Sequence, residues 1–141
     1  MNTASHGALI TRVGLAAVLL AHSLYLKGVV FTLPGTAEYF RSIGLPGAGA
    51  YLVFAVEAVA GLALLLGYRV RLAAAAVVPV LLGATWAHAG NGWLFTGSGG
   101  GWEYPLFLAA MATAQIFLGA GSFAIGNRLR TRPLEPSGVS A

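Results

Sequence analysis

The segment AYLVFAVEAVAGLALLLGYRVR, residues 50–71, decides how the rest of the sequence is interpreted. The apolar stretch from Gly49 to Gly67 has the length of a membrane-spanning helix, since a helix rising about 1.5 Å per residue needs about 20 residues to cross the hydrocarbon core. Glu57 lies near the middle of this stretch. A charge at that depth is costly, so we expect its side chain to face other helices and not lipid.

Composition places the chain in the membrane class. Of its 141 residues, 57% are hydrophobic and 9% are charged, whereas soluble domains carry about 25% charged residues. The formal charge of +4 does not indicate a nucleic-acid partner, because the arginines lie at the ends of apolar stretches, where membrane topology explains them. Cysteine is absent, which excludes disulfides, thiolate metal ligands and thiol redox chemistry. Any redox role therefore requires a bound cofactor or a partner subunit.

Further apolar stretches flank the first one and predict an all-α integral membrane protein, a four-helix bundle that occupies residues 1–127. The apolar N-terminal region is interpreted as a retained first span and not as a cleaved signal peptide. The basic segment 128–141 is expected to be a disordered cytoplasmic tail. The predicted spans are 8–33, 49–67, 70–90 and 104–125.

The connections between the predicted spans differ in kind. Residues 36–48 are amphipathic, with Tyr39, Phe40 and Ile43 close to helical spacing, which predicts a short helix at the membrane interface. Residues 91–103 form a glycine-rich segment with two tryptophans, a composition suited to a loop at headgroup level.

Arginine positions predict the orientation of the spans. Most basic residues fall at one set of span ends, and Arg69 and Arg71 are interpreted as topology anchors in the connection between the second and third spans. Cytoplasmic loops carry an excess of lysine and arginine, so both termini are expected in the cytoplasm. The arginines on this predicted cytoplasmic side are Arg12, Arg69, Arg71, Arg128, Arg130 and Arg132.

This topology gathers ionisable side chains from separate spans in the outer half of the bundle. Glu57 is expected to be either protonated or paired with His22, His88 or Lys27. Lys27 could instead extend to the lipid headgroups. Glu103, beside Trp102, opens the fourth span and is placed at the mouth of the same pocket.

Histidine, glutamate and lysine below a membrane surface suit a quinone headgroup, whose carbonyls need hydrogen-bond donors and whose reduction needs protons. The alternative for Glu57 is a structural ion pair or hydrogen bond that locks the bundle. Haem ligation by His22 and His88 has little support, because two histidines at unknown separation are weak evidence. A His/Glu metal site is supported no better, so no metal is predicted.

Several stretches also carry a family pattern. The segment EAVAGLALLLGYRVRLAA, 57–74, is the most specific one, with Glu57, Gly61, Gly67 and Arg71 as its characteristic residues. HSLYLK at 22–27, His88, GWEYP at 101–105 and LGAGSFAIG at 118–126 complete the pattern. On these residues the chain resembles the DoxX family of small bacterial membrane proteins over nearly its full length.

The resemblance implies a function as well as a fold. The family's name is attached to a subunit of a thiosulfate:quinone oxidoreductase, and other members are associated with membrane oxidoreductase assemblies. It therefore implies a multi-pass protein of the bacterial inner membrane that joins a soluble or membrane-bound oxidoreductase subunit and contacts quinone. Glu57 and His88 would take catalytic roles, and His22, Lys27, Glu103 and Trp102 would bind the ligand.

A second reading belongs to a different class of protein. Four spans without cofactor ligation also suit a non-catalytic membrane protein that binds or transports a lipid or small molecule, or that scaffolds a partner. Assembly into a homo-oligomer stays open under both readings, and the lipid bilayer is the expected surrounding in both.

Overall fold

The structure is a computed structural model that describes residues 3–130, and within that range it is helical without strands. The apolar stretches found in the sequence account for its long helices. In chain order the elements are α1 (Thr3–Leu20), η1 (Ala21–Val30, a π-helix), α2 (Leu33–Ser42), α3 (Ala48–Leu66), α4 (Val70–Ala87), η2 (Ala89–Asn91), α5 (Glu103–Leu118) and α6 (Ile125–Arg130).

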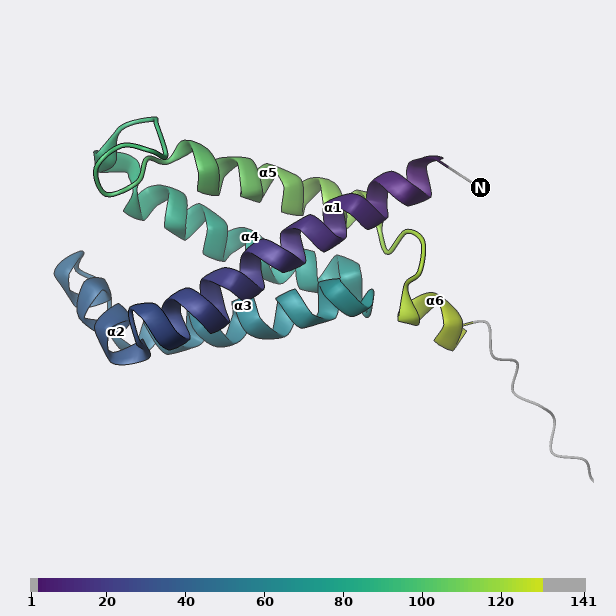
Figure 1. The fold of residues 1–141 in the computed structure, drawn as a ribbon, viewed down its shortest axis with the longest axis horizontal. Coiled ribbons are helices and arrows are strands. Elements are labelled where there is room, and N and C mark those ends of the chain that lie inside the picture. The colour runs from purple at the N-terminus through teal and green to yellow at the C-terminus, as the bar shows by residue number, and fades with distance from the viewer. Residues whose placement is uncertain (1–2, 131–141) are drawn as a thin grey trace, which may run out of the picture.

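Four helices pack against one another in a closed order: α1 contacts α3 and α5, and α4 contacts the same two helices (Figure 1). Their shared core combines leucine and valine side chains with alanines. Alanine leaves the helix backbones room to approach closely, which is how helices associate where lipid removes the hydrophobic driving force. The fully or nearly fully buried members of this core include Leu15, Ala16, Leu64, Ala74, Val77 and Ala112.

Three helical stretches are long and apolar enough to cross a membrane by length and composition: Thr3–Val30, which joins α1 to η1, Ala48–Leu66 and Val70–Ala87. The predicted fourth span, 104–125, is not one continuous helix. It is helical only to Leu118, because Gly119 takes a positive φ of 74° and ends α5 there. At 16 residues, α5 is about 24 Å long, shorter than a hydrocarbon core of about 30 Å.

The first span also ends earlier than expected, at Val30 and not at residue 33. Thr32, with φ 61°, breaks the helix, and its side chain accepts a hydrogen bond from the Gly35 N–H at 3.2 Å. The chain then continues into α2, which has Pro34 in its first turn. The short helix predicted within residues 36–48 is therefore present, but it begins at Leu33 and ends before Ile43, and its location at the membrane interface stays a prediction.

The predicted tail begins inside a helix. Residues 128–130 belong to α6, whereas the rest of the tail, residues 131–141, lies outside the described residues.

Arg12 connects three parts of the fold. Its side chain is 1% exposed, and its Nη1 donates to the carbonyls of Leu64, at 2.9 Å, and Leu65, at 3.3 Å. Its Nη2 donates to the Ser122 carbonyl at 3.2 Å, in the linker between α5 and α6. The last carbonyls of a helix lack intrahelical partners and carry the negative end of the helix dipole, so a guanidinium suits this position. Arg12 thus joins α1 to the end of α3 and to the linker.

Gly67 leaves the space that Arg12 occupies. It ends α3 with φ 72°, and a Cβ at this position would collide with Arg12 Nη1 and lie 2.6 Å from Ala124 Cα. Both the backbone conformation and the close approach require glycine.

We predict that Gly67→Ala lowers the free energy of unfolding by about 2 kcal/mol, because an L-residue in this conformation costs about 1–2 kcal/mol before any displacement of Arg12. Gly83→Ala is the matched control. Gly83 lies inside α4 with nothing near its missing Cβ, so the change should stay within about 1 kcal/mol of wild type. Unfolding monitored by circular dichroism in detergent checks both, and equal effects would contradict the prediction.

Candidate functional site

A buried ion pair joins η1 to α3. Lys27 Nζ lies 2.6 Å from Glu57 Oε2, and the two side chains are 15% and 8% exposed. Both residues belong to stretches of membrane-spanning length. Among the partners considered from the sequence, the structure therefore pairs Glu57 with Lys27, and Lys27 does not extend to the headgroups.

The packing of α3 against α1 allows Glu57 and Lys27 to meet. Glu57 lies on the buried face of α3 with Ala50, Ala60, Gly61 and Leu64, residues spaced to share one side of a helix. A Cβ at Gly61 would lie 2.9 Å from Leu20 Cγ, so the glycine allows α1 to approach α3 closely just before η1 begins.

The lysine comes from a π-helix, which the sequence did not indicate. The Phe31 N–H donates to the Leu26 carbonyl at 2.7 Å, a spacing of five residues that closes this element. Within it, Ser23 is fully buried and its hydroxyl donates to the Leu19 carbonyl at 2.8 Å. A π-helix is wider than an α-helix and turns its side chains through a different angle, and such segments are frequent at functional sites.

Of the two predicted histidines, His22 interacts with a member of the pair. His22, on the first turn of η1, is partly buried and interacts electrostatically with Lys27 and His88. His88 follows the last residue of α4. The structure therefore brings His22, Lys27 and Glu57 together, whereas His88, at the end of α4, lies within electrostatic range of His22 only.

Hydrogen bonds fix the proton position on His88. Its Nδ1 lies 3.1 Å from the Gly99 carbonyl oxygen and 3.0 Å from that of Gly100. Carbonyl oxygens only accept hydrogen bonds, so both contacts require a proton on Nδ1. Asn91 Nδ2 donates to the same two carbonyls, at 2.9 and 3.0 Å. His88 and Asn91 together hold the end of the glycine-rich loop against α4.

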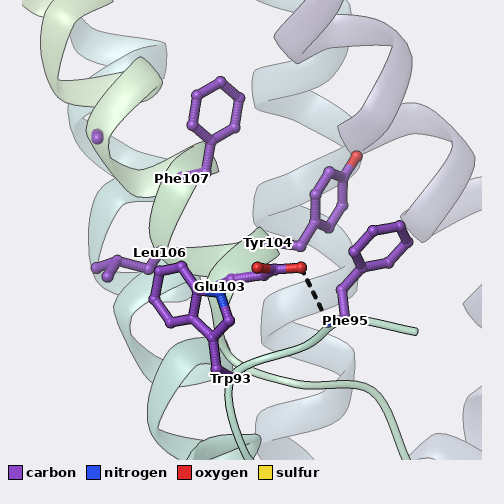
Figure 2. Close-up of a pocket in the computed structure, with 7 residues that line it drawn as sticks. Trp93, Phe95, Glu103, Tyr104, Leu106 and Phe107 are labelled. Carbon is purple, nitrogen blue, oxygen red and sulfur yellow. Dashed lines mark hydrogen bonds between the residues drawn. The ribbon is translucent and has the colours of Figure 1, made fainter. Parts of the chain in front are cut away.

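Glu103 and Trp102 lie elsewhere, between α5 and this loop. Glu103 Oε1 accepts a hydrogen bond from the Phe95 N–H at 3.1 Å, and the Trp102 ring packs edge-to-face on Trp93 with centroids 4.5 Å apart. Glu103 lines a groove of about 520 Å³ with mainly aromatic and aliphatic side chains (Figure 2). The residues that line this groove do not include His22, Lys27, Glu57 or His88.

Arg69 and Arg71 are exposed at the start of α4, beside the end of α3 where Arg12 binds. Arg69 Nε donates to the Tyr68 hydroxyl at 3.3 Å, which raises the pKa of the guanidinium. Arg71 approaches Gly119, since a Cβ on that glycine would lie 3.5 Å from Arg71 Nε. Their role in topology stays a prediction. Among the described residues, no group of three or more potential ligands could hold a metal ion.

Three roles were missed by the sequence analysis. Asn91 holds the loop through backbone carbonyls, a contact that has no sequence signature. Arg12 was interpreted only by its position near a span end. The groove could have been found, because Glu103 and Phe107 are four residues apart and therefore share a face of one helix.

Long apolar helices, a closed helix packing and a buried intramembrane ion pair define a small multi-pass membrane protein. A family model described as DoxX matches residues 7–90, more than half of the chain. The chain belongs to the DoxX family. The matched stretch contains the ion pair, His22 and His88, whereas the groove residues lie beyond it. No curated protein matches the chain, and no solved structure does.

We predict that Glu57→Gln or Lys27→Met alone lowers the unfolding free energy by about 3 kcal/mol, because each leaves the other charge buried without its partner. The double variant should cost less than the sum of the two. The exposed pair of Arg41 and Glu38 provides the control, and Glu38→Gln should cost less than about 1 kcal/mol. A double-mutant cycle in detergent measures the coupling, and strictly additive losses would show that the charges do not interact.

We predict that His88→Ala frees the glycine-rich loop. The change removes the Nδ1 contacts to Gly99 and Gly100 and leaves only Asn91 holding these carbonyls. Amide hydrogen exchange in residues 97–101 should become at least about fivefold faster, as a local opening that is easier by about 1 kcal/mol requires. Thr85→Ala, one turn earlier on α4, is the control, because its hydroxyl contacts only its own helix. Unchanged loop exchange in His88→Ala would refute this role.

Proposed function

We propose that this DoxX protein is the membrane subunit of an oxidoreductase assembly and that it contacts quinone beside the Lys27–Glu57 pair. The observation that carries the proposal is the ion pair itself, with Nζ and Oε2 2.6 Å apart in stretches of membrane-spanning length and His22 within electrostatic range of Lys27. Charged side chains inside membranes usually mark a substrate pathway or a proton relay.

The proposal includes a topology. Four spans, with α5 as the short fourth one, cross the bacterial inner membrane, and both termini lie in the cytoplasm. Support comes from the clustering of Arg12, Arg69 and Arg71 at one end of the packed helices, opposite the end that holds Lys27 and His88. Contacts of α5 with both α1 and α4 also favour its position among the spanning helices.

The residues at the pair have the groups that a quinone headgroup requires. Lys27 carries three N–H donors and directs one toward Glu57, so others are available for a carbonyl oxygen. His88 uses Nδ1 to hold the loop carbonyls, so its part in the proposal falls to Nε2. When bound, the quinone accepts two electrons and two protons. The chain's part is to bind the carbonyl, to deliver protons and to exclude water from the pair.

The electrons come from a partner subunit. The chain has no cysteine, so it has no thiol couple and no thiolate ligand for an iron–sulfur centre. A soluble or membrane-bound redox subunit that docks on this chain would supply the electrons, and this chain would connect that subunit to the quinone pool.

Purification from native membranes in mild detergent, followed by mass spectrometry, provides the first test. We expect a redox subunit in stoichiometric amount, and reduction of a short-chain benzoquinone by the complex. Glu57→Gln should lower this turnover at least about tenfold, as expected when a positioned proton-transfer group is lost. The complex should remain assembled.

Glu38→Gln is the matched control. It removes a carboxylate that pairs with Arg41 on α2, outside the intramembrane cluster, and should leave turnover unchanged. Absence of a redox partner would overturn the proposal that this chain is a subunit of an oxidoreductase assembly. An assembled Glu57→Gln complex with full turnover would assign the ion pair a purely structural role.

A further inference from the structure

The groove beside α5 is a second candidate site, distinct from the ion pair. One wall consists of Trp93 and Phe95 from the loop, and the other consists of the first two turns of α5 (Figure 2). Glu103, Phe107 and Ala110 lie three and four residues apart along α5, so they form one continuous strip of the groove.

A single carboxylate faces these aromatic rings. Glu103 Oε1 accepts the hydrogen bond of the Phe95 N–H, whereas Oε2 forms no hydrogen bond with the residues that the structure describes. No lysine or arginine lines the groove. An electronegative oxygen beside the faces of several aromatic rings attracts cations and disfavours anions, because ring faces carry partial negative charge.

The rest of the groove is apolar and open. Leu106 and Phe107 are 37% and 57% exposed, and they continue along α5 away from its N-terminal carboxylate. A soluble amine would leave this apolar strip uncovered, whereas an acyl chain attached to the cationic group would cover it. A membrane lipid with an ammonium in its headgroup would contact both the carboxylate and the apolar strip.

We propose that the groove formed by Trp93, Phe95 and the Glu103–Phe107–Ala110 strip of α5 binds a phospholipid with a primary ammonium headgroup, of the phosphatidylethanolamine type. The ammonium donates a hydrogen bond to Glu103 Oε2 and lies over the aromatic rings, and one acyl chain follows Phe107 and Ala110. This site is independent of the proposed redox role.

Lipid retention by the full-length protein tests this inference. The protein is reconstituted in nanodiscs that contain equal amounts of phosphatidylethanolamine and phosphatidylglycerol. It is then extracted in mild detergent, and its bound lipid is quantified by mass spectrometry. Wild type should retain phosphatidylethanolamine over phosphatidylglycerol by about fivefold, as a cation–π contact with a carboxylate partner implies. Glu103→Gln should bring this ratio close to one.

Two further variants sharpen the test. Phe107→Leu keeps the apolar strip but removes an aromatic ring, and it should lower the ratio at least about twofold; it also decides the question if Glu103→Gln does not fold. Glu38→Gln removes an exposed carboxylate on α2 and should retain lipid like wild type. Equal retention of the two lipids by wild type would overturn the proposal, as would a preference that persists in Glu103→Gln.

Discussion

The fold depends on one constraint: polar groups buried among apolar helices must find partners inside the protein, because lipid offers none. Two contacts between the first helical stretch and α3 satisfy this constraint at two different levels. Arg12 binds carbonyls at the end of α3, and Lys27, farther along the first helical stretch, binds Glu57 near the middle of α3. These contacts hold the first and third helices antiparallel and limit how they can slide past one another. The alanine-rich core then fills the space that the two contacts define.

Particular residues show which parts of the fold could be predicted from the sequence. The apolar stretches located the long helices, and the cost of a charge at membrane depth correctly placed Glu57 inside the protein. Its partner could not be chosen among three candidates, because helical periodicity gives the face of a side chain but not the offset between two helices. The π-helix at Lys27 changes that offset through a backbone pattern with no sequence signature. Gly119 ended α5 early, yet glycine is common inside membrane helices, so its effect could not be anticipated.

The residues of the candidate site were likewise predictable from the sequence only in part. Similar depth on packed helices suggested that Glu57 could pair with Lys27, and the structure contains this pair, with His22 in electrostatic contact with Lys27. Depth alone does not separate two surfaces at the same level, so Glu103 was assigned to the same pocket. In the structure it hydrogen-bonds to the loop and lines an aromatic groove. The loop is thus held at one end by His88 and Asn91 and at the other by Glu103.

The ion pair also has an electrical consequence. Lys27 and Glu57 together carry no net charge, so the intact pair is insensitive to the voltage across the membrane. A proton that reaches Glu57 cancels the carboxylate and leaves the ammonium of Lys27 as a net charge inside the field. Moving one elementary charge across a whole membrane changes its energy by about 2.3 kcal/mol per 100 mV. A charge that crosses only part of the membrane potential changes its energy by the same fraction of this value. Protonation at this position is therefore coupled to the energised state of the membrane, through a single pair of side chains 2.6 Å apart.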